Sequence, residues 1–226
     1  MIFTKSAPVP SRSSVIFAAI HRAMRADVTR LTDKVRTLGL RDRYQWRPLL
    51  EAFTHTITLM HYHHRSEEES IFPIVAARVP PFASSIELLE GDHVDLKSAA
   101  ARVAEDLRLV SADGSPGGWD SRRSRLIDDG DRFAAMLWAH LDREEDEVSS
   151  VLDFELGREE DYRLQAAMIG VGDTRIVSMI VPWVMRNADA SQHPQLRDVL
   201  PKRFLVVNGL VWQRRFARRV GGLYGP

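Results

Sequence analysis

The sequence predicts an all-α protein, an antiparallel up-and-down four-helix bundle over residues 13–155 followed by a helical C-terminal extension over residues 156–226. Four long segments carry apolar side chains at alternating steps of four and three, the spacing of helices with one buried face. Short stretches of turn residues separate these segments, and none shows the alternation of a strand. Long helices joined by short turns pack side by side in opposite directions, which predicts the bundle.

The first helix is expected to begin at Ser13 or Ser14, because a serine hydroxyl can accept a hydrogen bond from an N–H group of the first turn. Gly39 should end it. Its apolar stripe contains one histidine, His21.

The second helix is expected to begin near Trp46, with Pro48 in its first turn, and to finish before Pro80-Pro81. Its stripe continues through Ile71 and Ile74. A capping-box pattern at residues 84–87 should open the third helix. Residues 111–118 are interpreted as a turn, and the fourth helix should follow from about residue 120.

Composition limits the chemistry that this chain can perform. Its 226 residues include no cysteine, which excludes disulfides, thiolate metal sites and iron–sulfur clusters. Metal chemistry must therefore use histidine and carboxylate ligands, which suit iron, manganese or zinc. The net charge is zero, but residues 1–45 hold nine basic and three acidic side chains, and residues 201–226 hold six basic and no acidic ones. An acidic centre between basic ends favours a cation-binding core over a nucleic-acid surface.

The chain has no segment typical of export or membrane insertion. Its N-terminus lacks the basic-then-apolar pattern of a signal peptide, and no apolar run approaches the roughly 20 residues that span a bilayer. A cytoplasmic protein without a transmembrane segment is therefore expected.

Two helices carry a histidine and a glutamate four residues apart, which places both side chains on one helix face. A buried carboxylate without a partner would cost several kcal/mol, and a bound metal removes that cost by supplying the opposite charge. Residue counts from the turns place the histidines of neighbouring helices at similar depths, least well for the second and third helices. The candidate metal ligands are His21, His63, Glu67, His93, His140 and Glu144.

This pattern resembles the hemerythrin-like (HHE) cation-binding family. The order of the ligands, their spacing and the Glu-Glu-Ser-Ile-Phe-Pro sequence at residues 68–73 carry the resemblance over about residues 13–155. It implies two non-haem iron ions with an oxo or hydroxo bridge. The four histidines would be terminal ligands, and Glu67 and Glu144 would bridge the two ions.

Two departures from oxygen-carrying hemerythrins bear on function. Lys97 stands where those proteins have a fifth histidine, and the fourth helix places Glu144 three intervening residues after His140, with Glu145 next to it. Fewer ligands leave open metal positions, which favour reaction with peroxide, oxygen or nitric oxide in a peroxidase-, catalase- or oxidase-type activity. The alternatives are non-catalytic binding or sensing of oxygen, nitric oxide or iron, and a structural bundle without metal.

His64 and Glu68 repeat the four-residue spacing one step round the helix. They are interpreted as a solvated or outer pair, with replacement of His63 and Glu67 as the alternative. Glu90 is expected to accept a hydrogen bond from His93.

In the extension, Thr174 should cap a helix, and residues 204–220 should form a last helix that is apolar first and basic at its end. These helices are expected to pack on the bundle or to form a homodimer face. A membrane surface or an acidic partner is the alternative for the basic helix.

Overall fold

The computed structural model describes residues 10–112, 118–154 and 156–224, and all regular structure in these ranges is helical. The predicted all-α class is confirmed. The first part of the chain contains α1 (Arg12–Thr37), α2 (Arg43–Ser66), α3 (Phe72–Arg78), α4 (Ala83–Ala112) and α5 (Trp119–Phe154). The second part contains α6 (Arg158–Ile169), α7 (Thr174–Asn187), α8 (His193–Val199), α9 (Lys202–Val207), α10 (Gln213–Arg219) and α11 (Gly221–Tyr224).

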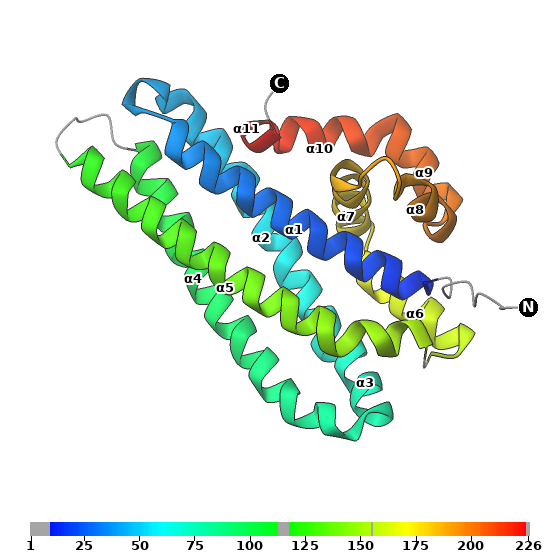
Figure 1. The fold of residues 1–226 in the computed structure, drawn as a ribbon. Coiled ribbons are helices and arrows are strands. Elements are labelled where there is room, and N and C mark those ends of the chain that lie inside the picture. The colour runs from blue at the N-terminus through cyan, green and yellow to red at the C-terminus, as the bar shows by residue number, and fades with distance from the viewer. Residues whose placement is uncertain (1–9, 113–117, 155, 225–226) are drawn as a thin grey trace, which may run out of the picture.

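Helices α1, α2, α4 and α5 are long and lie side by side (Figure 1). Each contacts two of the others, because α1 packs on α2 and α5, and α4 packs on the same two helices. Their apolar stripes meet in one core, in which Phe53 of α2 meets Phe133 of α5 edge to face at 5.9 Å. The predicted stripes therefore face inward.

A π-helical turn, Glu67–Ile71, separates α2 from α3. Such a turn takes in one more residue than an α-helical turn and so shifts every later side chain round the axis. Phe72 and Val75 are buried after this turn, whereas Ile74, expected in the stripe, is only half-buried. Ile71 itself is buried, so the predicted stripe is one residue out of step only after Ile71.

The start of α1 differs from the prediction. Ser11 is the N-cap, and its hydroxyl accepts from the N–H of Ser14 at 3.0 Å. Ser13, expected to cap, instead donates its hydroxyl to Asp161 of α6 at 2.7 Å. A tertiary contact therefore engages one of the two serines that local sequence favoured as the cap.

Three other predicted helix starts are also corrected. Ser84 lies inside α4 and donates to the carbonyl of Pro81 at 2.8 Å, so it does not open that helix as a capping box. Asp173, not Thr174, caps α7. Helix α2 begins three residues before Trp46, so a proline expected in its first turn lies inside the helix. Most of the predicted turn at 111–118 lies outside the described residues, and residues 111 and 112 belong to α4.

The C-terminal helices pack on α1 and α2, as expected for the extension. Helix α6 was not predicted. Apolar side chains on α9 and the following π-helical turn, Asn208–Trp212, are exposed at Val206, Val207, Leu210 and Val211. A homodimer through this region stays a prediction.

No single helix in the described ranges is apolar and long enough to cross a bilayer, although α6 and α7, bent by 93° relative to each other, satisfy the length and composition together.

A buried carboxylate joins the C-terminal helices to the long helices. Asp27 of α1 is 1% exposed and accepts hydrogen bonds from Thr56 of α2 at 2.7 Å and from Trp183 of α7 at 2.8 Å. Tyr224 of α11 and Arg30 also donate to it. Burial raises the pKa of Asp27, and these donors oppose that rise.

Replacing Asp27 by Ala should destabilise the protein by on the order of 3 kcal/mol, because buried donors lose their acceptor. Asp33→Ala, an exposed change on the same helix, is the matched control and should have little effect. Chemical unfolding of both variants measures the difference. Equal stability of the two variants would show that Asp27 does not hold the extension in place.

A second prediction concerns acid stability. His55 of α2 is 5% exposed and packs against Phe216 of α10, with ring centroids 5.5 Å apart. Burial, with a smaller contribution from Arg219, lowers the pKa of His55 to about 4. The unfolded chain takes up this proton near pH 6.5, so folding stability is lost as pH falls below that value.

His55→Leu should remove this loss, which amounts to roughly 3 kcal/mol at pH 4. Unfolding curves of wild type and variant from pH 7 to pH 4 measure it. Parallel pH dependence of the two proteins would contradict the assignment.

Candidate metal centre

All six predicted ligand side chains lie buried between the long helices. Each is at most 5% exposed. His64, interpreted from the sequence as part of a solvated or outer pair, is also buried and joins them at 4% exposure. The seven side chains fall into two adjoining groups, in each of which the potential ligand atoms lie within 4.8 Å of one another. Group one contains His21, His63, Glu67 and Glu144, and group two contains His64, His93 and His140.

Group one combines side chains of α1, of α2 with the π-helical turn that follows it, and of α5. The Nε2 atoms of His21 and His63 lie 3.0 Å apart, so both imidazoles point at the same position. Oε1 of Glu67 is 3.0 Å from Nε2 of His63, and Oε2 of Glu144 is 3.5 Å from Nε2 of His21. Four donor atoms thus converge from three helices.

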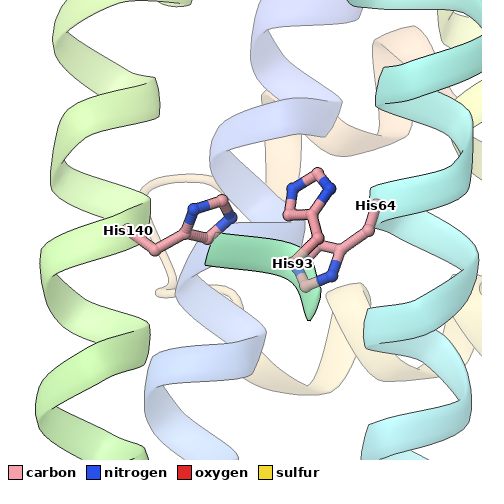
Figure 2. Close-up of side chains that lie close together, drawn as sticks. All are labelled: His64, His93 and His140. Atoms are coloured by element: carbon pink, nitrogen blue, oxygen red, sulfur yellow. The ribbon is translucent and has the colours of Figure 1, made fainter. Parts of the chain in front are cut away.

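Group two brings imidazoles from α2, α4 and α5 together (Figure 2). His64 stacks on His93 with ring centroids 3.9 Å apart and planes 4° apart. His140 meets both rings edge to face, at 4.8 Å from His93 and 5.3 Å from His64. These three rings come from helices that are distant in sequence, so only the tertiary packing places them together.

The two glutamates lie between the groups. Oε1 of Glu67 faces His63, and its Oε2 is 3.7 Å from Nε2 of His93. Glu144 has Oε2 toward His21 and Oε1 3.3 Å from Nε2 of His140. Each carboxylate therefore presents one oxygen to each group, which is the arrangement of a carboxylate that bridges two cations.

Three of the histidines also face a carboxylate with their outer nitrogen. The Nδ1 contacts are His21 with Glu145 at 3.0 Å, His93 with Glu68 at 2.7 Å and His140 with Asp92 at 3.4 Å. Arg25 contacts Glu145 at 2.5 Å, and Arg143 pairs with Asp92. Such outer contacts fix ring orientation and direct Nε2 toward a metal. Glu90, expected to accept from His93, is exposed, and Glu68 holds that position instead.

Electrostatics in this interior favour a bound cation. Burial raises the pKa of Glu67 and of Glu144, and the negative charge of Glu67 raises the pKa of Glu144 further. Burial also lowers the pKa of His63 to about 3 and of His140 to about 2, so these imidazoles are neutral with a free lone pair. Neutral imidazole and ionised carboxylate are the forms that bind metals.

Several buried atoms here have no hydrogen-bond partner among the described residues. They include both carboxylate oxygens of Glu67 and Glu144 and the Nε2 atoms of His64, His93 and His140. An unsatisfied buried polar group costs about 1–3 kcal/mol. All of these atoms point into the two groups, so cations held there would satisfy them together. The residues present fit a pair of bound metal ions.

A family comparison agrees with this geometry. The model of the hemerythrin HHE cation-binding domain matches residues 14–152, more than half of the chain. The chain belongs to the hemerythrin family. The match spans α1 to α5 almost entirely and ends before α6. No curated protein and no solved structure matches the chain.

The position of His64 in this hemerythrin domain was missed by sequence reasoning. The sequence did contain a signal for it, because Met60, His64, Glu67 and Ile71 follow steps of four, three and four. That series describes a buried stripe as well as the series through His63 does. Both histidines are buried because α2 packs against α1 on one side and α4 on the other.

Replacing Glu67 by Gln should act in opposite directions on the metal-free and metal-bound protein. It removes a buried charge, so the metal-free melting temperature should rise, and it removes charge from a carboxylate that faces both groups, so the metal-bound form should melt lower. Glu69→Gln, an exposed change two residues away, is the control. Calorimetry of both forms measures the shifts. Equal destabilisation of both forms by Glu67→Gln would assign Glu67 an ordinary structural role.

Proposed function

We propose that this chain is a non-haem di-iron protein that reacts with peroxide, oxygen or nitric oxide. In this proposal α1, α2, α4 and α5 form the antiparallel four-helix bundle of hemerythrins around two iron ions. The observation that supports it best is the position of Glu67 and Glu144, each with one oxygen toward each group of ligands. Two bridging carboxylates call for two cations.

The ligands divide unequally between the two positions. His21 and His63 would hold the first ion, whereas His64, His93 and His140 would hold the second, and both glutamates would be available to either ion. The first position therefore has fewer protein ligands. A metal position with fewer ligands is typical of a reactive site, since closed sites are typical of structural metals. Lys97, which follows His93 by one turn, is exposed and adds no ligand.

Iron bound at these positions would supply one-electron redox chemistry toward a small oxygen- or nitrogen-containing molecule. The protein's own residues hold protons and exclude water. Glu145 and Glu68 face Nδ1 of His21 and His93, which keeps the proton on the outer nitrogen and leaves Nε2 free for a metal. Both carboxylates are partly exposed, at 37% and 41%, so they also link the buried rings to solvent.

Aromatic side chains close the interior around the ligands. Phe17 packs on His21 with ring centroids 4.0 Å apart, and Phe72 stacks on His93 at 5.9 Å. Both phenylalanines are at most 2% exposed. A dry apolar wall strengthens electrostatic interactions inside it and limits entry to small molecules.

The metal content tests the proposal directly. The purified protein should hold close to two irons per chain and absorb in the near ultraviolet. His63→Ala should lose one iron, whereas His61→Ala, a neighbouring histidine outside both groups, should lose none. Metal analysis with an absorption spectrum measures both. Zinc alone, or no metal after expression in iron-rich medium, would overturn the di-iron proposal.

The second candidate is non-catalytic binding or sensing of oxygen, nitric oxide or iron. The burial of all seven candidate side chains favours it, because a tightly enclosed site can retain a ligand without turnover. Peroxide consumption separates the candidates. The oxidised, iron-loaded protein should consume peroxide faster than an equal amount of free iron, and His63→Ala should abolish that excess. A stable, reversible oxygen adduct without peroxide consumption would favour the binding protein.

A further inference from the structure

A second candidate site lies on the other side of α2, where the C-terminal helices cover it. A cavity of about 640 Å³ opens between α2, α7 and the segment from the second π-helical turn into α10. Buried His55, Met179 and Phe216 form its floor. Eight residues separate His55 from His63, about 12 Å along the helix axis, so this cavity is distinct from the metal centre. Cavities of this size hold small organic ligands.

The rim of the cavity is positively charged. Arg175 at the start of α7 and Arg215 and Arg219 of α10 line it, and all three are exposed. None of the three has an ion-pair partner among the described residues. Glu51 also lines the cavity, but its Oε1 is 3.2 Å from Nε of Arg47. Since Arg215 and Arg219 are four residues apart, they lie on one face of the helix.

An unsatisfied polar group lies on the floor. His55 is 5% exposed, and neither of its ring nitrogens has a hydrogen-bond partner among the described residues. Its lowered pKa keeps the ring neutral near pH 7, with one N–H to donate and one lone pair to accept. Buried polar groups are nearly always hydrogen-bonded, so an unpaired imidazole in a cavity wall indicates a partner that enters the cavity.

One wall is aromatic. Trp212 belongs to the π-helical turn Asn208–Trp212, and Phe216 follows one turn later on α10. Both line the cavity. The extra residue of a π-helical turn changes which side chains face inward, and such turns are frequent at functional sites. The wall therefore combines flat apolar surface with the arginines of the same helix.

We propose that this cavity binds a small organic anion, whose carboxylate or phosphate group is held by Arg175, Arg215 and Arg219. The apolar body of the ligand lies against Trp212 and Phe216, and a polar atom of the ligand reaches His55. Guanidinium groups match carboxylate and phosphate oxygens in paired hydrogen bonds. A cavity lined by apolar side chains with a few converging polar groups is typical of small-ligand sites. This site goes beyond the metal chemistry and does not depend on it.

The test uses the full-length metal-loaded protein and 1-anilinonaphthalene-8-sulfonate, a fluorescent anion with an aromatic body. We expect saturable binding of one probe per chain. Arg215→Ala/Arg219→Ala should weaken it at least tenfold. Arg214→Ala/Arg218→Ala removes the same charge from the same helix at residues outside the cavity lining, and should change affinity less than twofold. Equal losses in the two double variants would mean general charge attraction and would overturn the proposal.

Further measurements distinguish binding of the probe in the cavity from binding to the exposed apolar side chains nearby. Leu210→Ser should leave probe affinity unchanged, because Leu210 is 67% exposed and outside the cavity lining. His55→Phe, which fills the floor, should weaken binding severalfold while the thermal unfolding transition remains cooperative. Loss of binding in Leu210→Ser but not in Arg215→Ala/Arg219→Ala would place the probe on the exposed surface and overturn the proposal.

Competition identifies the anionic group. Decanoate and decyl phosphate should displace the probe from wild type, and the stronger competitor identifies the preferred group. Decanol, with the same chain and no charge, should compete at least tenfold less well than that anion. Failure of both anions to displace the probe, or equal displacement by decanol, would contradict a site built for an organic anion.

Discussion

The burial of Glu67 beside Glu144 is the constraint on which the rest of the centre depends. Two carboxylates with 0% exposure cannot both stay ionised in an apolar interior without an opposite charge close by. Burial raises the pKa of both, and their oxygens lack hydrogen-bond partners among the described residues. The surrounding imidazoles complete a set of donors that two cations would satisfy.

Successive layers of side chains surround Glu67 and Glu144: imidazoles first, then carboxylates, then arginines. Three of the imidazoles, His21, His93 and His140, turn their inner nitrogens toward the glutamates and their outer nitrogens toward a second layer of carboxylates. Arginines pair with part of that layer. Arg25 and Glu145 illustrate the balance: burial alone would raise the pKa of Glu145, yet His21 and Arg25 lower it to about 2. An ionised Glu145 can therefore keep a proton on Nδ1 of His21 and hold the ring in a metal-binding orientation.

Helix α2 serves two different environments. Its last turn supplies His63 and His64 to the hemerythrin centre, with Glu67 immediately after it, and its middle supplies His55 to the cavity under α10. The C-terminal helices stay in register with α1 through Asp27, which accepts hydrogen bonds from α2, α7 and α11. Helix α7, which Trp183 joins to Asp27, also supplies Arg175 and Met179 to the proposed anion site.

The sequence by itself determined the helical class, the inward faces of the long helices and the six candidate ligands, because helical periodicity and a four-residue spacing are local properties. It did not determine that His64 is buried, since that depends on α2 packing against two neighbours at once. The sequence also did not reveal the π-helical turn Glu67–Ile71 or the hydrogen bond from Ser13 to Asp161. Tertiary structure alone decided the contacts of Asp27 with Trp183 and Tyr224 and the cavity at His55. These partners lie more than 100 residues away in sequence and meet only when α7, α10 and α11 fold back onto the long helices.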